Sequence, residues 1–237
     1  MASLFQPEKK LKVKICGLSS PIDIYTCTDL GLNALGFIVK ATKPPTNTDI
    51  LLEEEAKVLI SHMPRNVKSV LLIKFSDINT IERLIKNVKP DIIQIQKEAD
   101  GLEIAKRLRT QFPDIEIIKT FYNAKDMTRE KLYHMIDEYA PYMDAANLDA
   151  EKGGGGKKHD WDIAADVSRY AKEKKISFIL SGGLDAHNLE EAYHKVKPDM
   201  MDIMSGARLE GRLDKKDPRK IEQIMNVVNR INSYEVQ

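Results

Sequence analysis

Residues 176–183 read Ile-Ser-Phe-Ile-Leu-Ser-Gly-Gly, a short apolar run that ends directly in a pair of glycines. A run of this length bounded by glycine predicts a buried strand followed by a tight turn. The next such run, residues 200–204, is likewise followed by Ser205 and Gly206. Working outward along the chain gives eight runs of this kind, at residues 12–16, 34–39, 67–74, 91–94, 115–120, 143–148, 176–180 and 200–204.

Stretches with the period of an amphipathic helix lie between these runs. Residues 50–60 precede the third run and residues 78–85 follow it, and residues 102–112 carry the next helical pattern. We expect a last helix to open at Asp217 and Pro218, an acidic cap followed by a proline in the first turn. Strands that alternate with helices predict βαβ units and a parallel sheet.

Eight such units, spaced close to the size of one βαβ unit, are what a (β/α)₈ barrel requires. An open doubly wound sheet uses similar units, so the period alone leaves that fold as an alternative. No linker rich in proline, glycine and serine divides the chain. We therefore predict an α/β protein with one domain, a single-domain (β/α)₈ TIM barrel over residues 1–237, with residues 1–11 as an N-terminal extension.

The chain has 237 residues, of which 42% are hydrophobic and 31% charged, and a net charge of +1. These values exclude a disordered chain and give no general attraction to nucleic acid or to a membrane. No apolar run reaches the ~20 residues of a membrane span, and the start has no signal-peptide core. Because two cysteines cannot form a disulfide framework, we expect a cytoplasmic protein. The basic cluster of Lys9, Lys10, Lys12 and Lys14 is interpreted as a solvated run.

The glycines gather just beyond the expected strand ends, which is the face where barrel enzymes build their sites. The turns after the last two strands, Ser181-Gly182-Gly183 and Ser205-Gly206, occupy the recurrent phosphate-binding position of barrels. The alternative is that these glycines serve only tight turns between strand and helix.

Two candidate catalytic side chains lie at the same face. Cys16 ends the first run, where a thiol could act as a base or nucleophile; the alternative is a buried, inert cysteine. Asp149 follows the sixth run, where a buried carboxylic acid could deliver a proton; the alternative is a turn-forming aspartate. Asp144 competes with Asp149 but lies at the start of the strand, and Cys27 is expected to serve packing.

Two other kinds of site are excluded by spacing. The glycine run at residues 153–156 followed by Lys157 lacks the spacing of a P-loop. The five histidines have no spacing suited to a structural metal site.

Five segments, in the same order and spacing from residue 12 to about residue 225, together resemble the phosphoribosylanthranilate isomerases of tryptophan biosynthesis. These segments are Val13-Lys14-Ile15-Cys16-Gly17-Leu18; Ala34-Leu35-Gly36-Phe37-Ile38; Leu148-Asp149 with Gly153 to Lys157 and His159-Asp160-Trp161; Leu180-Ser181-Gly182-Gly183-Leu184 with Asn188; and Asp202 with Ser205-Gly206.

The resemblance implies a (β/α)₈ barrel that performs a cofactor-free Amadori rearrangement of N-(5'-phosphoribosyl)anthranilate, a small-molecule phosphoribosyl substrate. It implies Cys16 as the general base and Asp149 as the general acid, acting on two different substrate atoms. It also implies that the loop after the sixth run closes over the substrate and that glycine-rich turns hold the 5'-phosphate. The phosphate-binding residues assigned in this way are Gly154, Gly155, Gly182, Gly183, Ser205 and Gly206.

The chain departs from the family where the substrate's anthranilate part would bind. After Phe37 the family usually carries an arginine, and residues 40–46 contain none. Residues 94–97 read Gln-Ile-Gln-Lys where the family has Gln-Leu-His-Gly, and Met204 stands where serine is usual. A lysine supplies charge but not the bidentate fork that a carboxylate prefers.

We assign the orienting of the substrate to Asp202, Lys43 and Arg208, with Lys40 as a further candidate for the missing cation. Two other functions stay open: a related barrel isomerase acting on another phosphoribosyl amine, and a non-catalytic paralogue that binds a sugar phosphate or a partner protein. The presence of both Cys16 and Asp149 counts against the second. The sequence makes no prediction of oligomeric state.

Overall fold

The computed structural model describes residues 3–5, 10–42, 48–74, 77–96, 101–124, 127–150 and 161–234. Within these residues, parallel strands form one sheet. The strands are β1 (Lys12–Cys16), β2 (Ala34–Val39), β3 (Ile50–Leu51), β4 (Lys68–Ile73), β5 (Ile92–Ile95), β6 (Glu116–Asn123), β7 (Ala145–Ala150), β8 (Ser177–Ser181) and β9 (Met200–Ile203). The order β1-β9-β8-β7-β6-β5-β4-β2 closes into a ring because β1 also pairs with β2. The predicted (β/α)₈ barrel is thereby confirmed.

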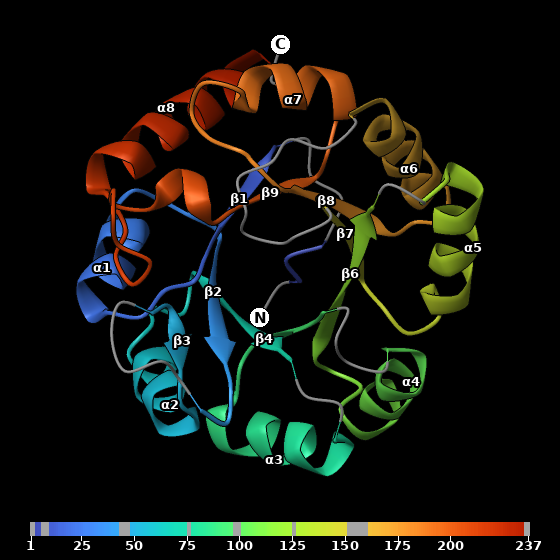
Figure 1. The fold of residues 1–237 in the computed structure, drawn as a ribbon, viewed down its shortest axis with the longest axis horizontal. Helices are drawn as coiled ribbons and strands as arrows, with labels where there is room; N and C mark the ends of the chain where they lie inside the picture. Colours follow the sequence, from blue (N-terminus) through green and yellow to red (C-terminus); the bar gives the residue numbers. More distant parts are fainter. Residues whose placement is uncertain are drawn as a thin grey trace.

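Helices surround this ring, one after each barrel strand (Figure 1). They are α1 (Pro21–Asp29), α2 (Glu53–Ser61), α3 (Ile78–Val88), α4 (Gly101–Gln111), α5 (Arg129–Tyr139), α6 (Trp161–Glu173), α7 (Leu189–Val196) and α8 (Pro218–Tyr234), with a short 3₁₀ helix η1 (Ser205–Ala207) before α8. Helix α8 begins as expected, because the Asp217 side chain accepts a hydrogen bond from the Arg219 N–H. No helix within the described part of the chain is long and apolar enough to cross a membrane.

One expectation about local structure is wrong. Ile50 and Leu51 belong to strand β3 and not to the start of a helix, and they pair with Ile38 and Val39 of β2. Helix α2 begins only at Glu53. The two apolar residues continue the helical pattern in sequence, but their pairing with β2, a tertiary contact, decides their conformation.

Side chains alternate along each strand between the barrel interior and the apolar layer under the helices. On β1, Val13 and Ile15 pack in the outer layer, whereas Cys16 joins the interior cluster. Lys14 is fully buried inside the barrel, and Lys12 is 8% exposed. The interpretation of the basic run as solvated is therefore wrong for these two lysines.

The N-terminal residues that the structure describes close the amino end of the barrel. The Lys12 ammonium donates to the Leu4 carbonyl at 2.6 Å, and the Ser177 hydroxyl donates to the Phe5 carbonyl at 3.3 Å. The Leu4 N–H donates to the Glu116 carboxylate at 3.1 Å, and Leu4 packs in the interior apolar cluster. Residues 3–5 of the expected N-terminal extension thus form the floor of the barrel, and its carboxyl end faces the other way.

Candidate active site

Three of the assigned residues come together at the carboxyl end of the strands. Cys16 is the last residue of β1, Asp149 lies one residue before the end of β7, and Asp202 lies on β9. Asp202 is in register with Lys14 on β1 and with Ser181 on β8. Asp202 influences the pKa of both Cys16 and Asp149, so the three side chains share one electrostatic environment.

The Cys16 thiol is buried, with 2% of the residue exposed. Its position is fixed by Gly36 on β2, since a Cβ added there would lie 2.9 Å from the Cys16 Sγ and 3.0 Å from the Lys14 Cε. Burial raises the pKa of Cys16 to about 11, although the positive charges of Lys14 and Lys216 act in the opposite direction. The thiol is therefore protonated at rest, in a place where cations can stabilise its thiolate.

Asp149 is 9% exposed, and its Oδ1 accepts a hydrogen bond from the Ala150 N–H at 2.8 Å. Burial raises its pKa to about 6, and the neighbouring Asp202 carboxylate adds to this rise. A carboxyl group with such a pKa is protonated in about one molecule in ten at pH 7, far more often than an ordinary aspartate, which suits a general acid.

A buried ion pair lies between these two groups. The Lys14 ammonium donates to the Asp202 Oδ2 at 2.5 Å, and Lys14 also interacts with Cys16. Burial opposes the charge of Lys14, but Asp202 and Cys16 outweigh that effect and its pKa is raised. The second Asp202 oxygen, Oδ1, is buried, and no described residue donates a hydrogen bond to it. It can accept a hydrogen bond from a bound hydroxyl group.

The two glycine turns lie against each other beside Asp149. Gly182 and Gly183 have φ values of +95° and +67°, in the left-handed region that favours glycine. A Cβ on Gly182 would lie 2.9 Å from both the Ala150 nitrogen and the Asp149 Oδ1. A Cβ on Gly206 would lie 2.1 Å from the Leu184 carbonyl oxygen. The turn after β8 therefore packs against β7 on one side and against the turn after β9 on the other.

A cavity of about 330 Å³ is bordered by Gly183, Ser205 and Gly206. Lys220 of α8 also lines this cavity, and its ammonium donates to the Arg208 carbonyl. Lys220 could not be singled out from the sequence, because it is one of several charged residues on an amphipathic helix. The cavity places a cation beside glycine-rich backbone, groups that can bind a small anion, and the Asp185 carboxylate also belongs to its lining.

Known proteins of one enzyme family are similar to this chain. The family model described as N-(5'phosphoribosyl)anthranilate (PRA) isomerase matches residues 13–227. The chain belongs to this family. A relative from Methanosarcina acetivorans named N-(5'-phosphoribosyl)anthranilate isomerase is 34% identical over 230 residues, which cover 91% of this chain and 93% of that protein.

Solved structures of PRA isomerases share the fold. The crystal structure of phosphoribosyl anthranilate isomerase from Thermotoga maritima has a TM-score of 0.75 at 21% identity, covering 92% of this chain and 98% of that one. A structure of the isomerase in complex with reduced 1-(o-carboxyphenylamino)-1-deoxyribulose 5-phosphate has a TM-score of 0.73 at 21% identity, with the same coverage of both chains.

Of the remaining assigned residues of this PRA isomerase family member, the structure describes Arg208. Arg208 follows η1, and its guanidinium donates to the Asp49 carboxylate just before β3. A Cβ on Gly17 would lie 2.8 Å from the Asp49 Oδ2, so this ion pair borders the loop that follows Cys16. Three assigned residues lie outside the described part of the chain: Lys43, Gly154 and Gly155.

Sequence reasoning missed Lys216, which lies on the same connection as Arg208. Lys216 is 4% exposed, and its ammonium has no hydrogen-bond partner among the described residues. Its sequence context, Asp214-Lys215-Lys216-Asp217, is that of an ordinary exposed turn. Only the folded position reveals that it is buried near Cys16.

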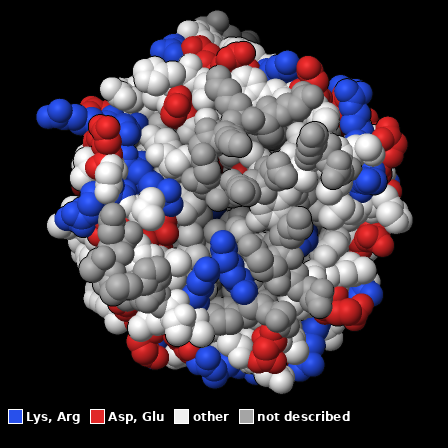
Figure 2. Space-filling view, in the orientation of Figure 1, with Lys and Arg blue, Asp and Glu red and all other residues white. Residues whose placement is uncertain are grey.

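Charged side chains are unevenly spread over the face viewed in Figures 1 and 2. Figure 2 shows Lys and Arg side chains gathered near the middle of this face, in the region of β2 and β4, while most Asp and Glu side chains lie toward the rim. In sequence, Lys40 and Lys74 directly follow these two strands. Cations at the centre of the face suit an anionic small molecule.

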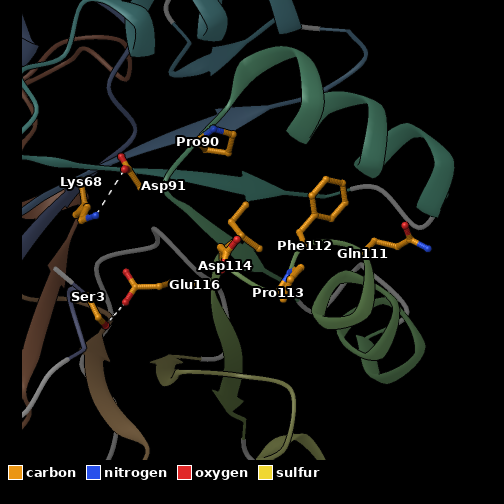
Figure 3. A pocket seen from close by; sticks show the side chains of 10 residues that line it. Ser3, Lys68, Pro90, Asp91, Gln111, Phe112, Pro113, Asp114 and Glu116 are labelled. Carbon is orange, nitrogen blue, oxygen red and sulfur yellow. Dashed lines mark hydrogen bonds and ion pairs between the residues drawn. The ribbon is translucent and has the colours of Figure 1, made fainter. Parts of the chain in front are cut away.

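A second cavity, of about 530 Å³, lies at the amino end of the strands (Figure 3). Its lining includes Ser3, Asp91 and Glu116, which belong to the segments that lead into the barrel. Asp144 also lies at this end, bound to Arg109 at 2.6 Å, which agrees with the expectation that Asp144 is on the wrong side for catalysis. Within the described residues, no group of histidine, cysteine and carboxylate side chains could hold a metal ion.

Proposed function

We propose that the chain converts N-(5'-phosphoribosyl)anthranilate to the 1-deoxyribulose 5-phosphate product, with Cys16 as general base and Asp149 as general acid. Family membership supports the reaction. The observation that carries the assignment of roles is the convergence of Cys16 and Asp149 on one ion pair, Lys14–Asp202, at the carboxyl end of the barrel.

The chemistry assigns a separate task to each group. Asp149 gives a proton to the ring oxygen of the ribose, the bond from that oxygen to C1' breaks, and the nitrogen lone pair forms a C1'=N double bond. The positive charge on nitrogen acidifies the C2' hydrogen, which the Cys16 thiolate removes. The resulting enolamine tautomerises to the ketone as a proton is added at C1' and one is lost from the C2' hydroxyl. No cofactor is needed, because no electrons leave the substrate.

In the resting protein, Cys16 and Asp149 each have the protonation state opposite to the one that reacts. With pKa values of about 11 for Cys16 and about 6 for Asp149, the resting pair is a thiol and a carboxylate. The reactive pair, a thiolate and a carboxylic acid, differs only by one proton moved between the two groups. At any pH between these two pKa values, the reactive pair makes up about one molecule in 10⁵ of the free protein, because the two pKa values differ by about 5.

We further propose that Asp202 orients a substrate hydroxyl, and that Gly182, Gly183, Ser205 and Gly206 hold the 5'-phosphate. Support comes from the unpartnered Asp202 Oδ1 and from the cavity beside the turns. The same proposal extends to Gly154 and Gly155 for the phosphate, and to Lys43 and Arg208 for orientation.

We also propose that this protein is cytoplasmic, and that it acts on a small molecule and has neither nucleic acid nor a membrane as a partner. Support comes from the near-neutral net charge and from the two buried cysteines, which are both unpaired.

The function is tested by generating phosphoribosylanthranilate in situ and following the loss of anthranilate fluorescence. Wild type should show turnover, and Cys16→Ser and Asp149→Asn should each lower kcat by about 10²-fold or more with little change in KM. Absence of wild-type turnover would refute the proposed substrate. Full activity of either variant would refute the role given to that residue.

A further inference from the structure

The connection between η1 and α8 turns back on itself as a short hairpin. Arg208 and Lys216 form an antiparallel bridge, and the hairpin is closed by hydrogen bonds on both sides of it. Side chains directly opposite each other on such a pair point to the same face, with their Cβ atoms about 5 Å apart. The hairpin therefore presents two cations side by side.

This arrangement is costly, because like charges directly opposite each other repel and because Lys216 is buried. The Arg208 guanidinium is held by Asp49, yet its Nε is buried and finds no hydrogen-bond partner in the part of the chain that the structure describes. The Lys216 ammonium, also buried, has no partner among the described residues. The two cations thus have donors left over in a place that water does not reach.

The carboxylates nearby do not neutralise both charges. Asp49 is committed to Arg208. Asp23 of α1 accepts a hydrogen bond from the Lys216 backbone N–H at 3.4 Å, not from its ammonium. Burial raises the pKa of Asp23, so its environment disfavours the carboxylate form. Burial lowers the pKa of Lys216, because no carboxylate among the described residues is committed to its ammonium and offsets the cost of burying that charge.

The position of Lys216 and Arg208 relative to Cys16 determines which part of a bound substrate they can contact. Lys216 interacts electrostatically with Cys16, with Arg208 and with Asp49. Around the barrel, the phosphate turns follow β8 and β9, Cys16 ends β1, and Asp49 follows β2, which lies on the other side of β1. Cys16 therefore lies between the phosphate turns and the Arg208–Asp49 ion pair, with Lys216 opposite Arg208 on the hairpin.

We propose that Lys216, together with Arg208, binds the aromatic carboxylate of the substrate. This inference rests on the proposed function. In phosphoribosylanthranilate the phosphate and the carboxylate lie on opposite sides of C2', the carbon that Cys16 deprotonates. With the phosphate at the glycine turns and C2' at Cys16, the carboxylate falls on the side of Lys216. The two oxygens of the carboxylate can accept hydrogen bonds from the Lys216 ammonium and the Arg208 Nε, the donors that have no partner among the described residues.

Binding of two ligands that differ only in the carboxylate tests the inference. One is reduced 1-(o-carboxyphenylamino)-1-deoxyribulose 5-phosphate, and the other is its phenylamino counterpart without the carboxylate. Calorimetry should show that wild type prefers the first ligand by roughly 10- to 100-fold, the range expected for a charge-assisted hydrogen bond. Lys216→Met should abolish this preference without weakening the phenylamino ligand, and Lys216→Arg should retain most of it.

Lys215→Met is the matched control, because it removes the same charge from an exposed position on the same hairpin. It should keep the wild-type preference. Thermal unfolding checks that Lys216→Met is folded, and it should be no less stable than wild type because it removes a buried, unpartnered charge.

The outcomes separate this inference from the proposed function. If wild type turns over the substrate and Lys216→Met keeps the preference, or weakens both ligands equally, the inference is overturned and the function stands. If Lys40→Met abolishes the preference instead, the carboxylate is bound at the end of β2 and the inference is overturned. If wild type shows the preference and Lys216→Met loses it but turnover is absent, the carboxylate site stands and the proposed reaction fails.

Discussion

Replacing Asp149 by asparagine should remove activity and, at neutral pH, make the protein harder to unfold. Burial raises the pKa of Asp149 from 3.8 to about 6, with the Asp202 carboxylate acting in the same direction. Asparagine keeps an oxygen to accept the hydrogen bond from the Ala150 N–H, but it has no charge to desolvate and no proton to give. A group kept for catalysis is then also a source of instability.

The sign and size follow from proton linkage. Because the folded protein binds this proton more tightly than the unfolded chain, its contribution to stability falls as the pH rises from about 4 to about 6. A pKa raised from 3.8 to about 6 corresponds to about 3 kcal/mol of unfolding free energy lost above that range. The asparagine variant has no such loss. Its advantage over wild type should therefore grow by about 2 kcal/mol between about pH 4.5 and about pH 7.5.

Urea unfolding followed by the fluorescence of Trp161 measures this difference at each pH. Using the change with pH cancels any constant effect of the substitution on packing or hydrogen bonding. If the stability difference between variant and wild type is the same at both pH values, Asp149 does not carry a raised pKa in the folded protein. Its assignment as the proton donor would then lose its physical basis.

Three other predictions follow from the same geometry. The kcat/KM should be flat between about pH 6.5 and pH 10 and fall about tenfold per unit below pH 6, because between their pKa values the reactive forms of Cys16 and Asp149 keep a constant population; a maximum within that window would contradict these pKa values. Gly36→Ala should lower the stability in urea by about 1–3 kcal/mol and lower kcat, since the new Cβ meets the Cys16 Sγ at 2.9 Å; wild-type kcat would show that the thiol position is unimportant. Asp144→Asn should lose about 1 kcal/mol through its ion pair with Arg109 and leave kcat unchanged, and a large drop in kcat would place the chemistry at the wrong end.

The barrel could be predicted because its signals are local. A run such as residues 176–180 is apolar on both faces and ends in glycine, so strand, turn and position in the ring are all encoded within a few residues. The same locality placed Cys16 and Asp149 at the carboxyl end. Strand β3 was not predicted, because two residues are too few to show the alternation of a strand. Its conformation depends on its pairing with β2.

The electrostatics of the site could not be predicted because they depend on contacts between distant parts of the chain. Lys14 lies in what reads as a solvated basic run, and its buried partner Asp202 is 188 residues away. Lys216 follows another lysine in a polar turn, and only one of the two is buried. Local composition is the same for a charge that faces water and a charge that faces the barrel interior.

The floor of the barrel has a consequence for how the chain folds. Residues 3–5 contact β1, β6 and β8, strands that lie far apart in the sequence. This segment can therefore take its place only after those strands have come together, so the floor is completed late in folding.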